Sequence, residues 1–329
     1  MAYEKQLELF KYMIPENRKD YTNVYEFLVN LPVFFFGHQD NDLYELNRPF
    51  IFNDVKYNLK IKRTRLSKEV DEFLTGKDQD LLYAILHLIT TKETNATVTD
   101  EGRVKAKLSI YQIYKTLKGK LSYEDIKKGI AKLKSTQLEI IPETKTPTSI
   151  RWACETIIAQ YMITDNRYNA DNPDDITYIE LSGAFSKAIT MGKVKLMNFP
   201  VYLSLKNPIS KYIYAQLTVF DFFSCKKERF YHKKSLFEFL ANGGFMCDTT
   251  QNKNNTMYSF RKAMDELKRK GLIAGYRLEP KHEGKKIVDY KLVSLTPAYD
   301  FNKENLKQRK EIRTYKKKER SLLEYMRGS

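Results

Sequence analysis

The chain carries an internal duplication, and this repeat limits its fold more than any other feature of the sequence. Residues 126–139, IKKGIAKLKSTQLE, align with residues 260–273, FRKAMDELKRKGLI, so that apolar and basic positions recur together at helical spacing. Two further pairs repeat upstream in the same order: SIYQIY (109–114) with SLFEFL (235–240), and LLYAILHLI (81–89) with YIYAQLTVF (212–220). The offsets of 126 to 134 residues indicate two copies of one module with loops of different length.

Each copy reads as three helices followed by strands. The first helix is densely apolar, the second is short, and the third follows a polar stretch in which Ser122 or Thr256 is the expected N-cap. The β-rich runs are LEII and IRWACETIIAQYMIT in the first copy, and IAGYRL and KIVDYKLVSL in the second. Three helices and a β-hairpin make a winged helix-turn-helix. The predicted fold class is therefore α+β, with two tandem winged helix-turn-helix domains.

The repeat predicts four segments. These are an N-terminal extension packed on the first module (1–65), the first winged helix (66–165), the second (166–300) and a basic tail (301–329). The extension contains β-strands, which we expect at Val33 to Phe36 and where Val55, Tyr57, Leu59 and Ile61 alternate with polar residues. The polar stretch TDNRYNADNPDDIT (164–177) is a linker or exposed loop.

The composition indicates a globular protein with a polyanionic partner. Apolar residues make up 42% of the chain and aromatic residues 13%, enough to build a buried core. The formal net charge of +16 favours nucleic acid or an anionic surface. No apolar run approaches the roughly 20 residues that span a bilayer, and the N-terminus lacks the layout of a signal peptide. We expect a cytoplasmic protein without a membrane partner.

The third helices are the candidate DNA-binding elements. A helix-turn-helix places its last helix in the major groove, and its wing lies along the backbone or minor groove. In the second copy, Phe260, Met264 and Leu267 supply the packing face. The predicted DNA contacts of this copy are Tyr258, Ser259, Arg261, Lys262, Asp265, Lys268 and Arg269 on the helix, and Lys281, His282, Lys285 and Lys286 at the hairpin tip. Those of the first copy are Ser122, Tyr123, Lys127, Lys128 and Lys134.

A basic surface helix without a binding role is the alternative for each copy taken singly. The recurrence of the same basic face in both copies favours double-stranded DNA as the partner. The tail adds charge, because residues 301–320 hold nine Lys or Arg and three Glu, a net charge of +6. This tail either forms a helix that contacts phosphates or stays mobile and raises general affinity for DNA.

The sequence lacks the common catalytic and metal-binding motifs. The sequence has neither the phosphate loop of nucleotide hydrolases nor the G-x-S-x-G turn of serine esterases. The four histidines are isolated, and the three cysteines lack metal-ligand spacing. Asp171, Asp174 and Asp175 do not have the spacing of a calcium loop. We therefore predict a non-enzymatic protein without a cofactor or metal.

Over residues 66–297 the chain resembles the Rep family, the replication initiators of plasmids with repeated origin sites called iterons. The resemblance is carried by LSKEVDEFLTGKDQDLLYAILHLI before the first module and by YIELSGAFSKAI and YLSLKNPISKYIYAQL before the second. The residues with most weight are Leu181, Ser182, Phe185, Ser210, Tyr214 and Leu217.

This resemblance implies a protein that binds repeated origin sites as a monomer, helps to open an adjacent AT-rich stretch, and recruits the host replicative helicase and initiator proteins. It also implies homodimers that occupy an inverted repeat and repress the initiator's own gene. By position, residues 258–270 are the main base reader, and residues 122–134 make a second groove contact or mainly hold phosphates. Which oligomer is the active form stays open.

Two other functions compete with this interpretation. The first is a winged-helix transcriptional regulator without an initiator role, for which the residues look almost identical. The second is a DNA-processing enzyme, a relaxase or a primase, whose site is assembled from residues far apart in the sequence.

Overall fold

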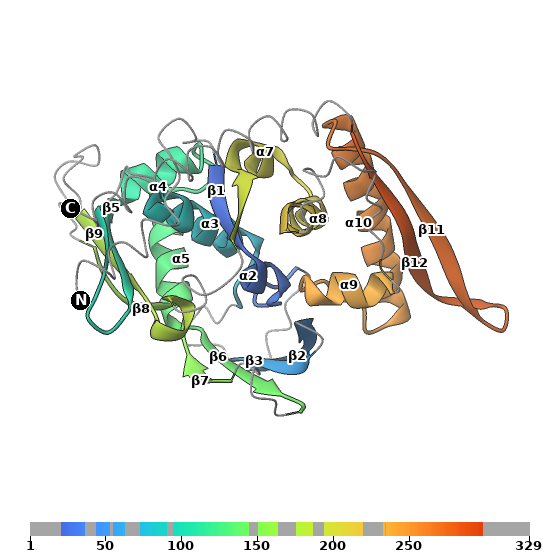
Figure 1. Ribbon diagram of the computed structural model, residues 1–329, viewed down its shortest axis with the longest axis horizontal. Coiled ribbons are helices and arrows are strands. Elements are labelled where there is room, and N and C mark those ends of the chain that lie inside the picture. Colours follow the sequence, from blue (N-terminus) through green and yellow to red (C-terminus); the bar gives the residue numbers. More distant parts are fainter. Residues whose placement is uncertain are drawn as a thin grey trace, which may run out of the picture.

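In the computed structural model, two helical modules lie side by side with a β-hairpin projecting from the second (Figure 1). The structure describes residues 21–36, 44–52, 55–62, 73–90, 95–144, 151–163, 176–186, 194–219, 233 and 235–298. The expected tail at 301–329 lies outside them, as do residues 1–20. Helices and antiparallel strands are both present in each module, which confirms the α+β fold class.

The first module contains three helices and a four-stranded sheet. The helices are α3 (Gly76–Thr90), α4 (Ile110–Thr116) and α5 (Tyr123–Ser135). The strands are β4 (Asn95–Val98), β5 (Val104–Ser109), β8 (Ile158–Ile163) and β9 (Ile176–Leu181), paired in the order β4-β5-β9-β8. Ser109 and Ser122 start α4 and α5 with capping boxes, so the predicted N-cap at Ser122 is confirmed.

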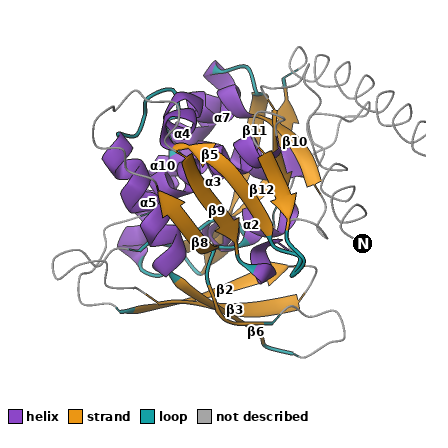
Figure 2. Cartoon of the chain, turned by 90° about the vertical axis from the view of Figure 1, so that its left-hand side faces the viewer, coloured by secondary structure: helices purple, strands orange, loops and turns teal. Residues whose placement is uncertain are grey.

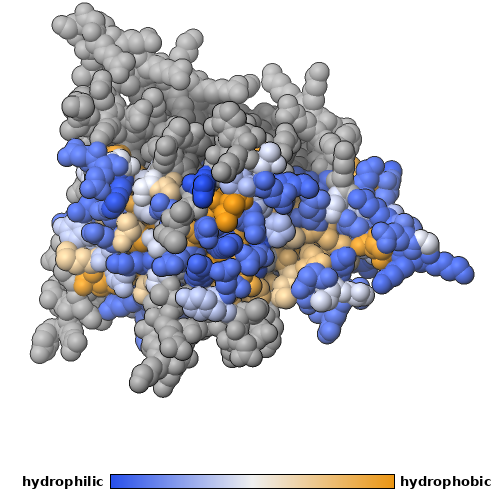
Figure 3. All heavy atoms as spheres, turned by 90° about the horizontal axis from the view of Figure 1, so that it is seen from below, coloured by the Kyte–Doolittle hydropathy of each residue, from blue (hydrophilic) through white to orange (hydrophobic). Residues whose placement is uncertain are grey.

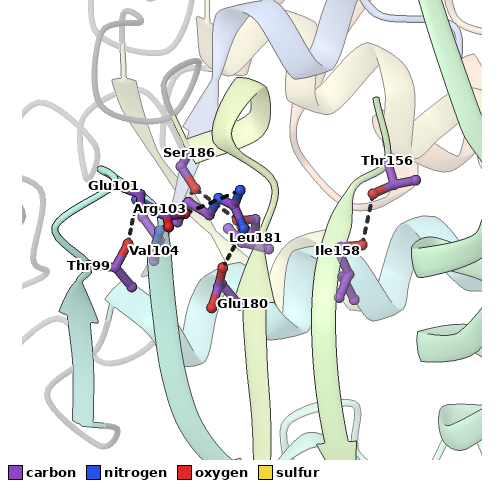
Figure 4. Close-up of polar contacts among 9 residues, drawn as sticks. All are labelled: Thr99, Glu101, Arg103, Val104, Thr156, Ile158, Glu180, Leu181 and Ser186. Atoms are coloured by element: carbon purple, nitrogen blue, oxygen red, sulfur yellow. Dashed lines mark hydrogen bonds and ion pairs between the residues drawn. The ribbon is translucent and has the colours of Figure 1, made fainter. Parts of the chain in front are cut away.

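The sheet of the first module changes the predicted boundary between the modules. Strand β9, placed in the second module by the sequence, pairs with both β5 and β8 (Figure 2). Side chains reinforce this pairing, because Arg103 Nη1 donates to Glu180 Oε1 at 3.0 Å and Ser186 Oγ accepts from Val104 N at 3.0 Å (Figure 4). The boundary predicted at 165/166 therefore moves beyond Leu181. Residues 164–175 of the expected linker lie outside the described residues.

The second module repeats the order of three helices and a hairpin. It consists of α8 (Pro208–Val219), α9 (Leu236–Asn242), α10 (Thr250–Arg269), β11 (Ile273–Glu283) and β12 (Lys286–Pro297). Lys233, just before α9, forms a single antiparallel bridge to Leu292 of β12. The first module has the same relation between β5, which precedes α4, and β9. In both modules the segment before the second helix therefore pairs with the last strand.

The N-terminal extension contributes a hairpin that joins a second sheet. Its strands are β2 (Glu45–Phe52) and β3 (Val55–Lys62), and β3 pairs with β6 (Gln137–Pro142), which pairs with β7 (Trp152–Glu155). Tyr57, Leu59 and Ile61 are buried and Val55 is half-buried, which confirms the strand predicted from their alternation.

The strand predicted at Val33 to Phe36 is wrong. This segment forms only isolated bridges, from Phe35 to Thr75 and from Phe36 to Phe245, because it runs between the modules and its side chains pack on both. The Phe36 ring stacks on Phe245 of the second module with centroids 4.7 Å apart. The extension therefore contacts both modules, and not the first alone.

The two modules are joined through equivalent elements. Strand β1 (Tyr21–Tyr25) and helix α2 (Glu26–Asn30) precede α3, as β10 (Val194–Asn198) and α7 (Phe199–Ser204) precede α8, and β1 pairs antiparallel with β10. Asp80 of α3 and Lys211 of α8 occupy equivalent positions of the repeat and form a buried ion pair with Nζ 2.7 Å from Oδ1. Contacts between equivalent residues are those of a two-fold axis. The duplicated modules are therefore arranged as a pseudo-symmetric pair.

Candidate nucleic-acid interface

Helix α10 is longer than the sequence predicts. Thr249 is its N-cap and accepts from the backbone N–H of Asn252 at 3.1 Å, whereas the expected N-cap Thr256 lies inside the helix. Thr256 is buried, and its hydroxyl donates to the carbonyl of Met246 at 2.7 Å. The predicted start was wrong because Thr256 serves a tertiary contact. The helix ends before Gly271, whose φ of +66° suits glycine.

The buried and exposed sides of α10 separate as predicted. Phe260, Met264 and Leu267 are fully buried. The exposed residues among the predicted contacts of α10 are Tyr258, Arg261, Lys262, Asp265, Lys268 and Arg269. Lys262 Nζ lies 4.3 Å from the centroid of the Tyr258 ring, so these two side chains present one cationic and aromatic surface. Ser259 is half-buried, and its carbonyl accepts from the Asn207 side chain at 3.0 Å.

Three polar residues on the first turns of α10 extend this exposed surface. Gln251, Asn254 and Asn255 lie on the same side of the helix as Tyr258 and Lys262, at spacings of three and four residues. Gln251, Asn254 and Asn255 are absent from the predicted contacts, because the helix was expected to start after them. The signal that identifies them is Thr249 followed by Asn252, which marks the earlier N-cap.

The C-terminal part of α10 is held against the start of α8 by the carboxylate of Glu266. Glu266 Oε1 accepts from the backbone N–H of Lys206 at 2.8 Å, and Oε2 from that of Asn207 at 3.1 Å. Burial acts to raise the pKa of Glu266, but the hydrogen bonds that it accepts from the backbone N–H groups of Lys206 and Asn207 help to lower the pKa below its ordinary value. Glu266 is therefore held as a carboxylate, and α10 keeps a fixed position against α8.

The hairpin β11–β12 occupies the position predicted for the wing of the second module. Lys281, His282, Lys285 and Lys286 are exposed at its tip, where Gly284 has a φ of +60°. Lys281 Nζ lies 3.8 Å from Asp289 Oδ2, so its charge is partly balanced. Seen from below, the end of the molecule where β11 and β12 project is covered mainly by hydrophilic residues (Figure 3). The tip can contact phosphates on either side of a groove.

On α5, more of the residues predicted to contact DNA have partners within the protein than on α10. Ser122 Oγ accepts from the Asp125 N–H at 3.1 Å in the capping box. The Tyr123 ring stacks on Tyr114 at 4.9 Å, and Lys128 Nζ lies 3.0 Å from Glu124 Oε1. Lys127 is half-buried, and Lys134 is exposed with its Nζ 5.8 Å from the Tyr161 ring centroid.

A basic cleft of about 1040 Å³ connects the two modules. Lys127 and Lys128 of α5 line one side, and Lys206 and Lys211 at the start of α8 line the other. Asp78, Asp80 and Asp125 also line it, so part of the positive charge is balanced. Glu266 of α10 accepts from the backbone N–H of Lys206, so the α8 side of the cleft lies next to α10.

Histidine, cysteine and acidic side chains are possible metal ligands, and those in the described part of the chain are placed as follows. Within them, no group of three or more His, Cys, Asp or Glu side chains is placed to hold a metal. His282 is exposed, His87 stacks on Phe199 at 5.0 Å, and Asp171, Asp174 and Asp175 lie outside the described residues. Burial raises the pKa of the Cys247 thiol to about 12, so it is protonated at neutral pH.

In the described part of the chain, every helix is too short or too polar to cross a lipid bilayer.

The comparisons with known proteins find similar solved structures only. No family model matches the chain, and no curated protein matches it. The chain is similar to domains 2 and 3 of RctB, with a TM-score of 0.47 and 13% identity over 80% of this chain and 95% of that one. It is also similar to the Pi initiator protein in complex with iteron DNA, with a TM-score of 0.46 and 17% identity over 68% of this chain and 90% of that one.

Proposed function

We propose that the chain is a sequence-specific, double-stranded DNA-binding replication initiator. It binds repeated sites at a plasmid origin, promotes opening of the origin, and recruits the host replicative helicase and initiator proteins. It acts in the cytoplasm without catalysis, cofactor or metal, and as a homodimer it represses its own gene.

One observation carries the DNA-binding part of this proposal. Helix α10 is the third helix of a winged helix, its apolar side is fully buried, and its opposite side presents Tyr258, Arg261, Lys262 and Lys268 to solvent. A third helix in this position enters the major groove, and its first residues lie nearest the bases. The cationic wing tip beside it fits the flanking phosphates.

The pseudo-symmetric arrangement supports binding of both modules to one duplex. Helix-turn-helix pairs related by two-fold symmetry contact half-sites about 34 Å apart, one turn of the double helix. Lys127 and Lys128 of α5 and Lys206 before α8 line the cleft between the modules, and they fit the phosphates that separate the two grooves. On this arrangement α10 reads bases and α5 mainly holds the backbone.

The initiator role is supported by the sequence resemblance to the Rep family. Ser210, Tyr214 and Leu217 of that resemblance are buried on α8. Ser210 Oγ donates to the Ala263 carbonyl of α10 at 3.2 Å, so this part of the resemblance consists of residues that position the proposed reading helix.

The proposal is tested by selecting bound fragments from random duplex DNA, followed by footprinting and a permanganate assay for unpaired thymines. We expect direct repeats, strand opening next to them, and an affinity that falls steeply with added salt because cationic contacts release counterions. Selection of a single palindrome, with no unpaired thymines beside it, would indicate a transcriptional regulator and not an initiator. Metal-dependent nicking or nucleotide incorporation would indicate an enzyme, and an affinity independent of salt would point to a protein partner.

A further inference from the structure

The first turns of α10 are a feature of the second module alone. Tyr123, the first residue of α5, aligns with Met257 of α10, so the segment from Thr250 to Thr256 has no helical counterpart in the first module. This segment continues the exposed side of α10 toward its N-terminus. In a helix-turn-helix, this end of the third helix lies nearest the base edges.

Apart from Thr250, the exposed side chains of this segment are amides. Gln251 and Asn252 flank the start, and Asn254 and Asn255 follow one turn later. Asn252 has a structural role, because its Nδ2 donates to Asp248 Oδ1 at 2.6 Å. Asn254 and Asn255 are exposed, and neither makes a side-chain hydrogen bond with the residues that the structure describes. Asparagine is a poor helix former, so neither residue is there for helix stability.

We propose that Asn254 and Asn255, with Gln251 beside them, read adenines in the major groove. An Asn or Gln amide forms two hydrogen bonds with one adenine, because its carbonyl accepts from N6–H and its NH₂ donates to N7. No other base presents this pair of groups in the major groove. The inference rests on the proposed function, and it adds the class of base that this part of α10 recognises.

The rest of the exposed stripe sets the order of the recognised bases. Arg261 fits guanine O6 and N7, and Asp265 fits the N4 amino group of cytosine. The helical rise of 1.5 Å places Arg261 about 10 Å further along α10 than Asn254. We therefore expect the amides and Arg261 to contact different base pairs of one site.

The experiment compares the parent chain with an Asn254→Ala/Asn255→Ala double variant on the DNA selected by the parent. Alanine is a better helix former, so the double variant keeps α10 intact, which circular dichroism checks. Each adenine of the site is replaced in turn by 7-deazaadenine, which lacks the N7 acceptor. For the parent, we expect one or two replacements to weaken binding about 5-fold to 100-fold, the range of a good bidentate base contact. The double variant binds the unmodified site more weakly and is insensitive to the same replacements.

A Lys268→Ala variant is the matched control, because Lys268 is exposed near the other end of the same helix. It should weaken binding to all sequences alike and keep the parent's sensitivity to 7-deazaadenine. If the double variant keeps that sensitivity, or if the parent never shows it, the amides are not adenine readers although the chain binds DNA. If the parent selects no DNA at all, the proposed function fails and this inference fails with it.

Discussion

The third helices of the two modules have equivalent places in the fold but use their polar residues differently. In α5, Asp125 closes the capping box with Ser122, and Glu124 pairs with Lys128. In α10, the first turn has no acidic residue, and Arg261 and Lys262 are exposed. Polar groups that are paired within the protein are poor candidates for base recognition. The two helices therefore keep equivalent places in the fold, and under the proposed function α10 is the better candidate for base recognition.

The buried sides of these helices differ at one equivalent position. Lys132 of α5 aligns with Glu266 of α10, and both face the start of the first helix of their module. Lys132 Nζ lies 2.8 Å from Asp78 Oδ2, and Asp78 itself accepts from the Thr75 N–H at 2.7 Å. In the second module, Glu266 accepts directly from the Lys206 N–H, which is equivalent to that of Thr75. The backbone N–H before the first helix is thus capped by that helix's own Asp78 in the first module. In the second module the equivalent N–H is capped by Glu266 of the third helix.

The largest effect should come from Lys132→Met, which removes the partner of buried Asp78. Leaving one charge of a buried pair uncompensated costs about 3 to 5 kcal/mol in the free energy of unfolding. Urea denaturation measures this loss. The control is Lys128→Met, at an exposed pair on the same helix, which should cost less than about 0.5 kcal/mol. Equal losses of unfolding free energy in the two variants would contradict the structural role assigned to Lys132.

Next in size is the effect of Arg261→Ala or Lys262→Ala on specific DNA binding. Either change should weaken binding to the selected site by about 1 to 3 kcal/mol if the side chain contacts a base. The equivalent changes on α5, Lys127→Ala and Lys128→Ala, should cost about 1 kcal/mol or less and act alike on all sequences. Titrations against the selected site and a scrambled duplex check this. Parent-like binding by both α10 variants would contradict the placement of the helix in the groove.

An effect of similar size that depends on pH is expected for Glu266→Gln. The lowered pKa of Glu266 in the folded state means that its carboxylate stabilises the fold above its ordinary pKa of 4.5. This contribution disappears as the pH falls through the lowered pKa. At pH 7 the variant should lose roughly 1 to 3 kcal/mol of unfolding free energy, the range for hydrogen bonds to a charged group. The difference from the parent should shrink below pH 4.5, and a difference that grew there would reverse the assigned sign.

The smallest effect is expected at the wing. The Lys285→Ala/Lys286→Ala double variant should bind specific and non-specific DNA more weakly by similar factors, because both side chains are placed to contact phosphates. The slope of log affinity against log salt should fall by about 1 for each lysine that contacts a phosphate. An unchanged slope would show that Lys285 and Lys286 do not contact the DNA.

Several parts of this fold follow from the sequence because local patterns are enough to define them. The alternation of Tyr57, Leu59 and Ile61 predicts β3, and the apolar stripe of Phe260, Met264 and Leu267 predicts the buried side of α10. Ser122 is identified as an N-cap by its place in the polar stretch before an apolar helical stripe. The predicted exposed residues of α10 are found exposed, with Ser259 half-buried against α8.

Other parts depend on contacts between residues far apart in the chain. Val33 to Phe36 has the composition of a strand, but its partners are Phe73 and Phe245, which pack on its rings without forming a ladder. Thr256 looks like an N-cap, but the Met246 carbonyl gives its hydroxyl a partner inside the fold. The start of α10, and with it Asn254 and Asn255, was missed for this reason.

The sequence by itself determined that one module occurs twice, because apolar periodicity and capping residues act over a few turns and survive in both copies. Only the tertiary structure decided that β9 completes the first sheet, and that Asp80 and Lys211 meet between the modules. Strand pairing and buried ion pairs depend on which distant segments the chain brings within hydrogen-bonding distance. That information lies in the packing of the two modules together and not in any local stretch of residues.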